Sequence, residues 1–184
     1  MRIAHVEIFA LLSGLRADVT VLRVRVADIE LFLPAQNAAM MNRPSITPTH
    51  AATVGSGQYV MAVTVLRGKL DLASFEEEFL HDNKVRQLMN KVKVSAAGDL
   101  ECHYPKSWPG RVVVRSVSGA IHSEEVIIPK GESGNPMSAA EIEEKFLSLA
   151  APVVEDERAL LVQREIRSLE ERQSLEGVLA ALAG

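Results

Sequence analysis

The sequence predicts an α+β fold in which helices cover an antiparallel β-sheet. Residues 111–129 hold two β-branched runs around Ser118 and Gly119, a pattern typical of a β-hairpin. Apolar residues recur at helical spacing before and after this hairpin. The predicted order is therefore a helix, a strand, helices, three strands and further helices, which matches the α+β class.

The first elements follow from periodicity. Residues 5–15 have approximately helical spacing, and residues 18–33 alternate as a half-buried strand does. A lone helix is an unusual start for a complete domain, so we expect the sequence to begin partway through a larger fold. Residues 34–53 contain three prolines and are expected to form a loop.

The segment 54–67 is ambiguous from its residues alone. It is rich in valine, and its periodicity permits either a helix or a buried strand. Gly68 would end a helix well. Ser74 precedes a short acidic helix that runs to Leu80, and Asp82 or Asn83 starts another.

The remaining predicted elements are a further strand of the sheet and the helices that follow the hairpin. Residues 91–94 are predicted to form a strand. Ser138 and Glu141 have capping-box spacing, so a helix is expected to begin there. One or two further amphipathic helices are expected over residues 156–183. The predicted buried stripe of the capped helix consists of Ile142, Phe146 and Leu149.

The composition excludes several function classes. The chain has 184 residues and a formal net charge of -4, which does not favour nucleic-acid binding. The single cysteine, Cys102, permits neither an internal disulfide nor a paired-cysteine zinc site, and it fits a reducing, cytoplasmic setting. No apolar run is long enough to span a membrane. The histidines lack partners at ligand spacing, so no metal and no cofactor are expected.

Three stretches carry a resemblance to a known family. They are "THAATVGSGQYVMAVTVLRGKLDLASFEEEFLHDNKVRQLMNKVKV", "RVVVRSVSGAIHSEEV" and "PKGESGNPMSAAEIEEKF". Together and in this order, they resemble the MmgE/PrpD family of 2-methylcitrate dehydratase, cis-aconitate decarboxylase and iminodisuccinate epimerase. The resemblance covers the C-terminal part of the family pattern.

The resemblance implies a domain plan. Residues 1–152 would form the family's smaller α+β lid domain, and residues 153–184 a helical segment packing on it or on a partner. The family's large helical domain, which holds most of the catalytic acids and bases, would lie outside this sequence. The reactions implied begin with proton abstraction next to a carboxylate and act on di- or tricarboxylates.

The resemblance also implies a site. Tyr59 would be the catalytic group of the lid domain, and Ser56, Gln58 and His5 would contact the substrate. Ser56 is also placed to cap a helix through the Tyr59 N–H. A tyrosine at a helix start is more often a packed core residue, so a purely structural role for Tyr59 stays open as the alternative. The family often has a basic residue just before this serine, and this sequence has none there.

Two functions remain open at this stage. One is a lyase or isomerase fragment or subunit, inactive without the helical domain, whose partners would be a small carboxylic acid and a separate helical-domain chain or a second copy. The alternative is a non-catalytic oligomerisation or interaction module, or a truncated gene product. An orphaned lid is expected to expose an apolar patch made of Phe9, Leu11, Val60 and Met61. Neither nucleic acid nor a membrane is an expected partner.

Overall fold

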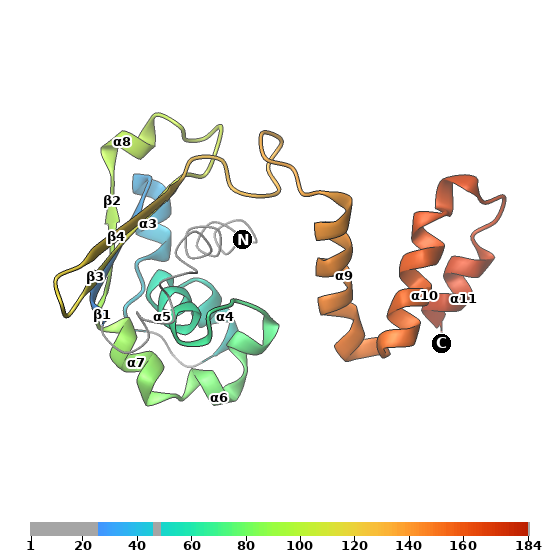
Figure 1. Cartoon of the computed structure of the whole chain (residues 1–184), viewed down its shortest axis with the longest axis horizontal. Coiled ribbons are helices and arrows are strands. Elements are labelled where there is room, and N and C mark those ends of the chain that lie inside the picture. The colour runs from blue at the N-terminus through green and yellow to red at the C-terminus, as the bar shows by residue number, and fades with distance from the viewer. Residues whose placement is uncertain (1–25, 46–48, 184) are drawn as a thin grey trace. The chain divides into compact units, whose positions relative to one another are not determined.

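The protein is described by a computed structural model that places residues 26–45 and 49–183 (Figure 1). The chain divides into two compact units, residues 1–135 and 136–184. The two compact units divide after residue 135. The predicted domain boundary after residue 152 lies later in the chain, inside a helix of the second unit. That boundary stays a prediction about the family's domain plan.

A four-stranded sheet organises the described part of the first unit, in the order β2-β1-β3-β4. Antiparallel pairing joins β1 to β3 and β3 to β4, but β1 and β2 are parallel. The predicted α+β fold with an antiparallel sheet is confirmed, with a correction at this one pair. The chain between β1 and β2 is a long helical crossover, which permits parallel pairing. The strands are β1 (Val26–Leu33), β2 (Val92–Ala96), β3 (Gly110–Ser116) and β4 (Ile121–Val126).

One face of the sheet carries the core of this unit. Ile29, Leu31 and Val112 are fully buried there, as alternation along a strand requires. The opposite face is polar, and Arg115 bridges Asp28 and Glu30 on β1 with N···O distances of 2.6 and 2.9 Å. Figure 1 shows α3 and α5 on the covered side of the sheet.

The predicted loop over residues 34–53 is wrong for two segments, which form α3 (Ala35–Met41) and α4 (His50–Val54). The segment of α3 is rich in alanine and methionine, which are strong helix formers. Pro34 immediately precedes it, where a proline does not interrupt the helix. Thr49 caps α4, because its hydroxyl accepts the Ala52 N–H at 3.3 Å.

The ambiguous valine-rich segment is a helix, α5 (Gly57–Arg67), which ends at Gly68 with a φ of 73°. This left-handed cap is the conformation that glycine adopts at least cost. Helix α5 is buried on almost every side, including Val60 and Met61, neither of which is exposed. The predicted exposed patch is therefore wrong for these two residues, because they lie in the unit's own core. Its other members, Phe9 and Leu11, lie outside the described residues.

Four short helices follow α5 in the described part of the first unit. The predicted acidic helix ends at Leu80 as expected but begins only at Glu77, because Ser74 belongs to a separate 3-10 helix that Asp71 caps. Asp82 caps the next helix through the Lys84 N–H at 2.7 Å, as expected. The elements are η1 (Leu72–Phe75), α6 (Glu77–Leu80), α7 (Asn83–Met89) and α8 (Gly98–Glu101).

The second unit is helical. Ser138 and Glu141 form the predicted capping box. The predicted buried stripe is wrong, because α9 has no buried residue and Ile142 and Leu149 are 55% and 43% exposed. The helix α10 meets another flank of α9, where Arg167 pairs with Glu143 at 2.9 Å. The elements are α9 (Ala139–Val154), α10 (Asp156–Arg167), η2 (Leu169–Glu171) and α11 (Glu176–Ala183).

Candidate functional site

The start of α5 is held by Ser56. Its Oγ accepts the Tyr59 N–H at 3.2 Å, as the predicted cap requires, and donates to the Arg43 carbonyl at 2.7 Å. Ser56 is fully buried. Its hydroxyl is therefore engaged on both sides, and it fixes the beginning of α5 to the chain that follows α3.

Gln58 makes a second link to the same segment. Its Nε2 donates to Asn42 Oδ1 at 2.7 Å, and its Oε1 accepts the Arg43 N–H at 3.0 Å. Gln58 is 2% exposed. Both polar atoms of its side chain therefore find their hydrogen-bond partners inside the protein. Ser56 and Gln58 together orient the first turn of α5.

Tyr59 lies in the first turn of α5 and is 1% exposed. Its hydroxyl donates to the Ser74 carbonyl at 2.7 Å, and its ring centroid lies 5.9 Å from that of Phe75. Burial raises the pKa of the Tyr59 phenol to about 12, although the positive charge of Arg67 opposes this shift. Tyr59 is therefore a protonated hydrogen-bond donor at neutral pH.

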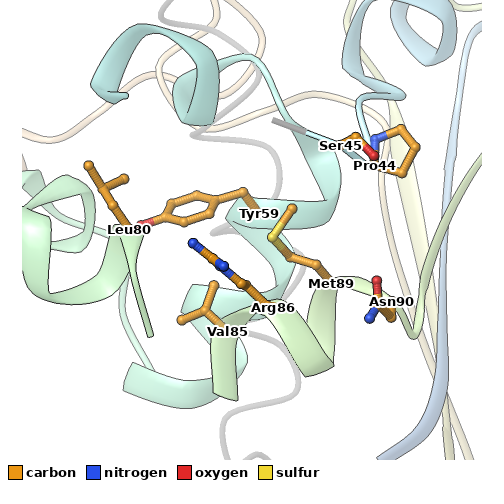
Figure 2. A pocket seen from close by; sticks show the side chains of 8 residues that line it. All are labelled: Pro44, Ser45, Tyr59, Leu80, Val85, Arg86, Met89 and Asn90. Carbon is orange, nitrogen blue, oxygen red and sulfur yellow. The ribbon is translucent and has the colours of Figure 1, made fainter. Parts of the chain in front are cut away.

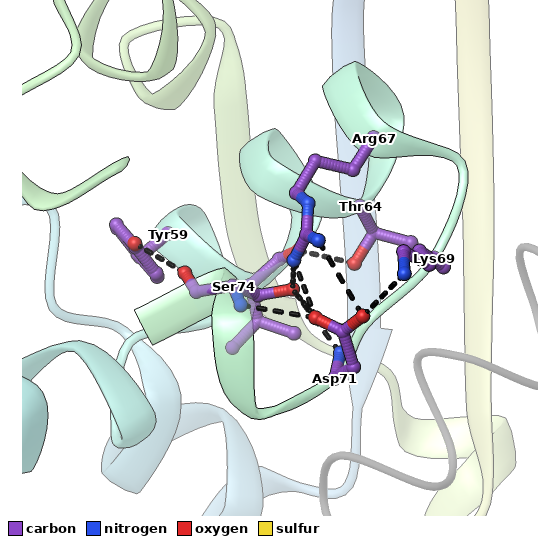
Figure 3. Close-up of polar contacts among 7 residues, drawn as sticks. Tyr59, Thr64, Arg67, Lys69, Asp71 and Ser74 are labelled. Atoms are coloured by element: carbon purple, nitrogen blue, oxygen red, sulfur yellow. Dashed lines mark hydrogen bonds and ion pairs between the residues drawn. The ribbon is translucent and has the colours of Figure 1, made fainter. Parts of the chain in front are cut away.

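Ser74 also receives the other end of α5 (Figure 3). Arg67, in the last turn of that helix, hydrogen-bonds to both the Asp71 carboxylate and the Ser74 hydroxyl. Its guanidinium carbon lies 4.6 Å from the centroid of the Phe79 ring, a cation–π contact. The first and last turns of α5 thus converge on one residue of η1.

The carboxylate of Asp71 is the acceptor of this network. Burial alone would raise its pKa, but hydrogen bonds from Lys69, Arg67 and Ser74 outweigh that effect and lower the pKa to about 2. The Lys69 Nζ lies 2.7 Å from Asp71 Oδ2. Asp71 therefore stays ionised at neutral pH and is committed to holding the turn, not to proton transfer.

A cavity of about 480 Å³ lies beside Tyr59 (Figure 2). Helix α7 and its C-cap form much of its wall, and α5, α6 and the chain after α3 contribute the rest. Figure 2 shows the Arg86 side chain extending from α7 toward the Tyr59 ring. The described lining residues are Pro44, Ser45, Tyr59, Leu80, Val85, Arg86, Met89 and Asn90.

Two arginines near this region were not predicted from the sequence as site residues. Arg86 lines the cavity, and the Arg43 guanidinium packs on Gly55, where an added Cβ would lie 3.0 Å from Arg43 Nη1. Both arginines lie away from the local run that precedes Ser56. The available signal was helical spacing, since Arg86 and Asn90, the C-cap residue of α7, are four residues apart.

The structure thus brings three of the four predicted site residues together in or next to the first turn of α5: Ser56, Gln58 and Tyr59. The fourth, His5, lies outside the described residues. Within the described ranges, no cluster of His, Cys, Asp or Glu side chains could hold a metal ion. None of the described helices combines the length and apolar character that a membrane crossing needs.

Comparison with known sequences adds the family context. A sequence model of the MmgE/PrpD C-terminal domain matches residues 2–171. A cis-aconitate decarboxylase-like protein, oryM, of Aspergillus oryzae is 28% identical over 127 residues, which cover 68% of this chain. The matched region spans about a quarter, 26%, of the length of that relative.

Proposed function

Because the chain belongs to the MmgE/PrpD family, we propose that it serves as the C-terminal domain of a lyase or isomerase that acts on di- or tricarboxylates. The match over residues 2–171 carries this proposal, since it includes α5, the cavity and the hairpin. The similarity to a cis-aconitate decarboxylase-like protein supports the same substrate class. The reaction would begin with proton abstraction next to a carboxylate, followed by loss of water or by reprotonation on the other face. A decarboxylation would instead end with a proton delivered to the carbanion that loss of carbon dioxide leaves.

Tyr59 is the proposed catalytic group of this domain. A phenol that stays protonated at neutral pH can donate a hydrogen bond or a proton to a carboxylate or to the enolate-like charge that develops. In the present structure it donates to the Ser74 carbonyl. Engaging a substrate would require Tyr59 to exchange that partner.

The resemblance implies that Ser56 and Gln58 contact the substrate. Because their polar atoms are already hydrogen-bonded within the protein, they are proposed to act by setting the position of α5. Their hydrogen bonds fix the turn that carries Tyr59. His5 is proposed as a further substrate contact, on the resemblance alone. The base that removes the proton is expected from a helical domain, supplied within a longer chain or by a partner chain.

Reconstitution tests this proposal. The chain would be mixed with the helical domain of a family member, and 2-methylcitrate and cis-aconitate would be followed by ultraviolet absorbance and proton NMR. We expect turnover with the mixture and none with either component alone. A Tyr59→Phe variant should lose most of the turnover, whereas Tyr104→Phe, which removes an exposed hydroxyl bonded to Gln36, should keep it. A stable complex with no turnover of any di- or tricarboxylate would contradict the proposal.

A non-catalytic interaction module is the second candidate, and one observation favours it. Helices α9 to α11 expose many large apolar side chains, including Leu149 and Val153. Such surface is typical of a protein–protein contact. Light scattering after gel filtration would test it: a stable self-associated species that binds no carboxylate and gains no activity favours the module.

A further inference from the structure

We propose that the second unit forms a domain-swapped dimer, in which α10 and α11 leave their own α9 and pack on the α9 of a second copy of the chain. In this dimer α9, Glu155 and α10 form one continuous helix. The inference concerns the assembly of the chain and is independent of the proposed activity.

The connection between α9 and α10 is a single strained residue, Glu155. Its φ is 66° and its ψ is 155°, a region that only glycine occupies at low cost. Among the residues that the structure describes, Glu155 is the one non-glycine residue with a positive φ. A hinge this short and strained favours domain swapping, because opening the hairpin relieves the strain.

Opening the hairpin also completes the backbone hydrogen bonding of both helices. Helix α9 ends and α10 begins at Glu155, and no side chain caps the start of α10. With Glu155 at helical angles, the first N–H groups of α10 would donate to the last carbonyls of α9. Pro152 already lies inside α9, so the continuous helix needs no new interruption.

The part that would be exchanged is held together by its own contacts. The Arg158 guanidinium of α10 donates to the carbonyls of Ala181 and Leu182 at 2.9 and 2.8 Å. Helices α10 and α11 both contain buried residues, whereas α9 has none. The pair can therefore move as one body, and its contacts with α9 would be remade with the α9 of the second copy.

The swap would also cover an apolar stripe that solvent now contacts. Ile142, Leu149 and Val153 of α9 are exposed, and Val153 reaches 80%. They recur at intervals of seven and four residues, and the exposed Leu160 of α10 follows Val153 by another seven. In one continuous helix these four side chains share a face, with the spacing of a coiled coil. Two such helices, one from each copy, can pack along that face.

Sedimentation velocity of two hinge variants tests the proposal. Glycine adopts the angles of Glu155 without strain, so Glu155→Gly should stabilise the hairpin, whereas Glu155→Ala keeps the strain and favours a helix. Both variants remove the same carboxylate and are therefore matched in charge. Strain of this kind is worth about 5–150-fold at each hinge, and a swapped dimer has two hinges. Glu155→Gly should therefore raise the dimer dissociation constant by about 25-fold or more relative to Glu155→Ala.

Cross-linking tests whether the dimer is swapped. Glu143 Oε1 and Arg167 Nη1 lie 2.9 Å apart between α9 and α10, so Glu143→Cys with Arg167→Cys places two thiols across the hairpin. Cys102→Ser removes the exposed native thiol. A short bismaleimide should link two chains in a swapped dimer but only one chain in a closed hairpin. We expect covalent dimers on a denaturing gel, and internally linked monomers once Glu155→Gly is added.

Four results would overturn the proposal. The first three are a chain that stays monomeric at every accessible concentration, a dimer in which only internal links form, and equal dissociation constants for Glu155→Gly and Glu155→Ala. The fourth is a monomer that binds a helical domain through the stripe, with Val153→Gln weakening that complex, since another partner would then cover this surface. None of these results bears on the turnover expected on reconstitution.

Discussion

Helices α5 and α9 have similarly apolar sequences, but they differ completely in burial. Helix α5 is enclosed by β2, α7 and η1 within its own unit, and nine of its eleven residues are buried. Helix α9 is longer, has a perfect capping box, and buries none of its residues.

The difference shows what each unit needs. The described part of the first unit contains partners for the apolar side chains of α5, so that helix is stabilised by packing inside its own unit. The second unit leaves large apolar side chains in contact with solvent. Substitution of an apolar side chain should therefore lower the unfolding free energy in the first unit. In the second unit it should weaken binding to another protein molecule.

Replacing a core side chain of α5 should have the largest effect. Met61→Ala removes a fully buried side chain, and such truncations cost about 2–5 kcal/mol of unfolding free energy. Urea denaturation followed by circular dichroism would measure the loss. A change below about 1 kcal/mol would break the comparison, since it would mean that α5 is packed no better than α9.

Removal of the Tyr59 hydroxyl should have the next largest effect. Tyr59→Phe leaves the buried Ser74 carbonyl without its donor, which we expect to cost about 1–3 kcal/mol. Thermal and urea unfolding would measure it, with Tyr104→Phe as the exposed control. Equal stabilities of Tyr59→Phe and the wild type would show that this hydroxyl is free to serve a substrate at no structural cost.

The charge of Asp71 should contribute less, and in a pH-dependent way. Asparagine can also cap a helix, so Asp71→Asn mainly removes the charge that Lys69 and Arg67 bind. The folded pKa of about 2 lies below the ordinary 3.8, so the stabilisation is complete above about pH 4 and disappears as the pH falls through about 2. After a discount for its partial exposure, we expect about 1 kcal/mol at neutral pH.

Unfolding free energies from pH 2 to 7 would check this sign. The difference between wild type and Asp71→Asn should be largest at neutral pH and should shrink on acidification. A difference that stays constant across this range would mean that the capping geometry, and not the charge, stabilises the turn.

The smallest effect on stability is expected in the second unit. Leu149→Ala removes a side chain that is 43% exposed, so the unfolding free energy should change by no more than about 0.5 kcal/mol. The same substitution should reduce self-association or binding of a helical domain, measured by sedimentation velocity. A large loss of stability in the monomer would show that α9 already has a buried partner.

Local patterns in the sequence were sufficient for much of the fold. Ser138 with Glu141 predicted the start of α9, and Ser118 with Gly119 predicted the turn of the hairpin. These features depend on neighbouring residues alone. The segment of α5 stayed ambiguous from its residues alone, because a helix buried on almost every side has no amphipathic period to detect.

The failures have a common physical cause. Periodicity correctly identified an apolar stripe on α9, but it cannot show whether another surface covers that stripe. In α3, the prolines that suggested a loop in fact flank a helix of good helix formers. The candidate site was predicted where Ser56 and Tyr59 are close in sequence. Arg86 was missed because it reaches the Tyr59 cavity only through the packing of α7.

The place of β1 within the sheet has a consequence for biosynthesis. Among the described strands it lies second in the sheet, yet its partners β2 and β3 both come much later in the sequence. A ribosome adding about 5–20 residues per second therefore makes α3 to α7 before β1 gains either of these neighbours. Both hydrogen-bonding edges of β1 lack these partners for several seconds, on the order of the time needed to synthesise the crossover. Nascent chains should need protection from aggregation mainly in this interval.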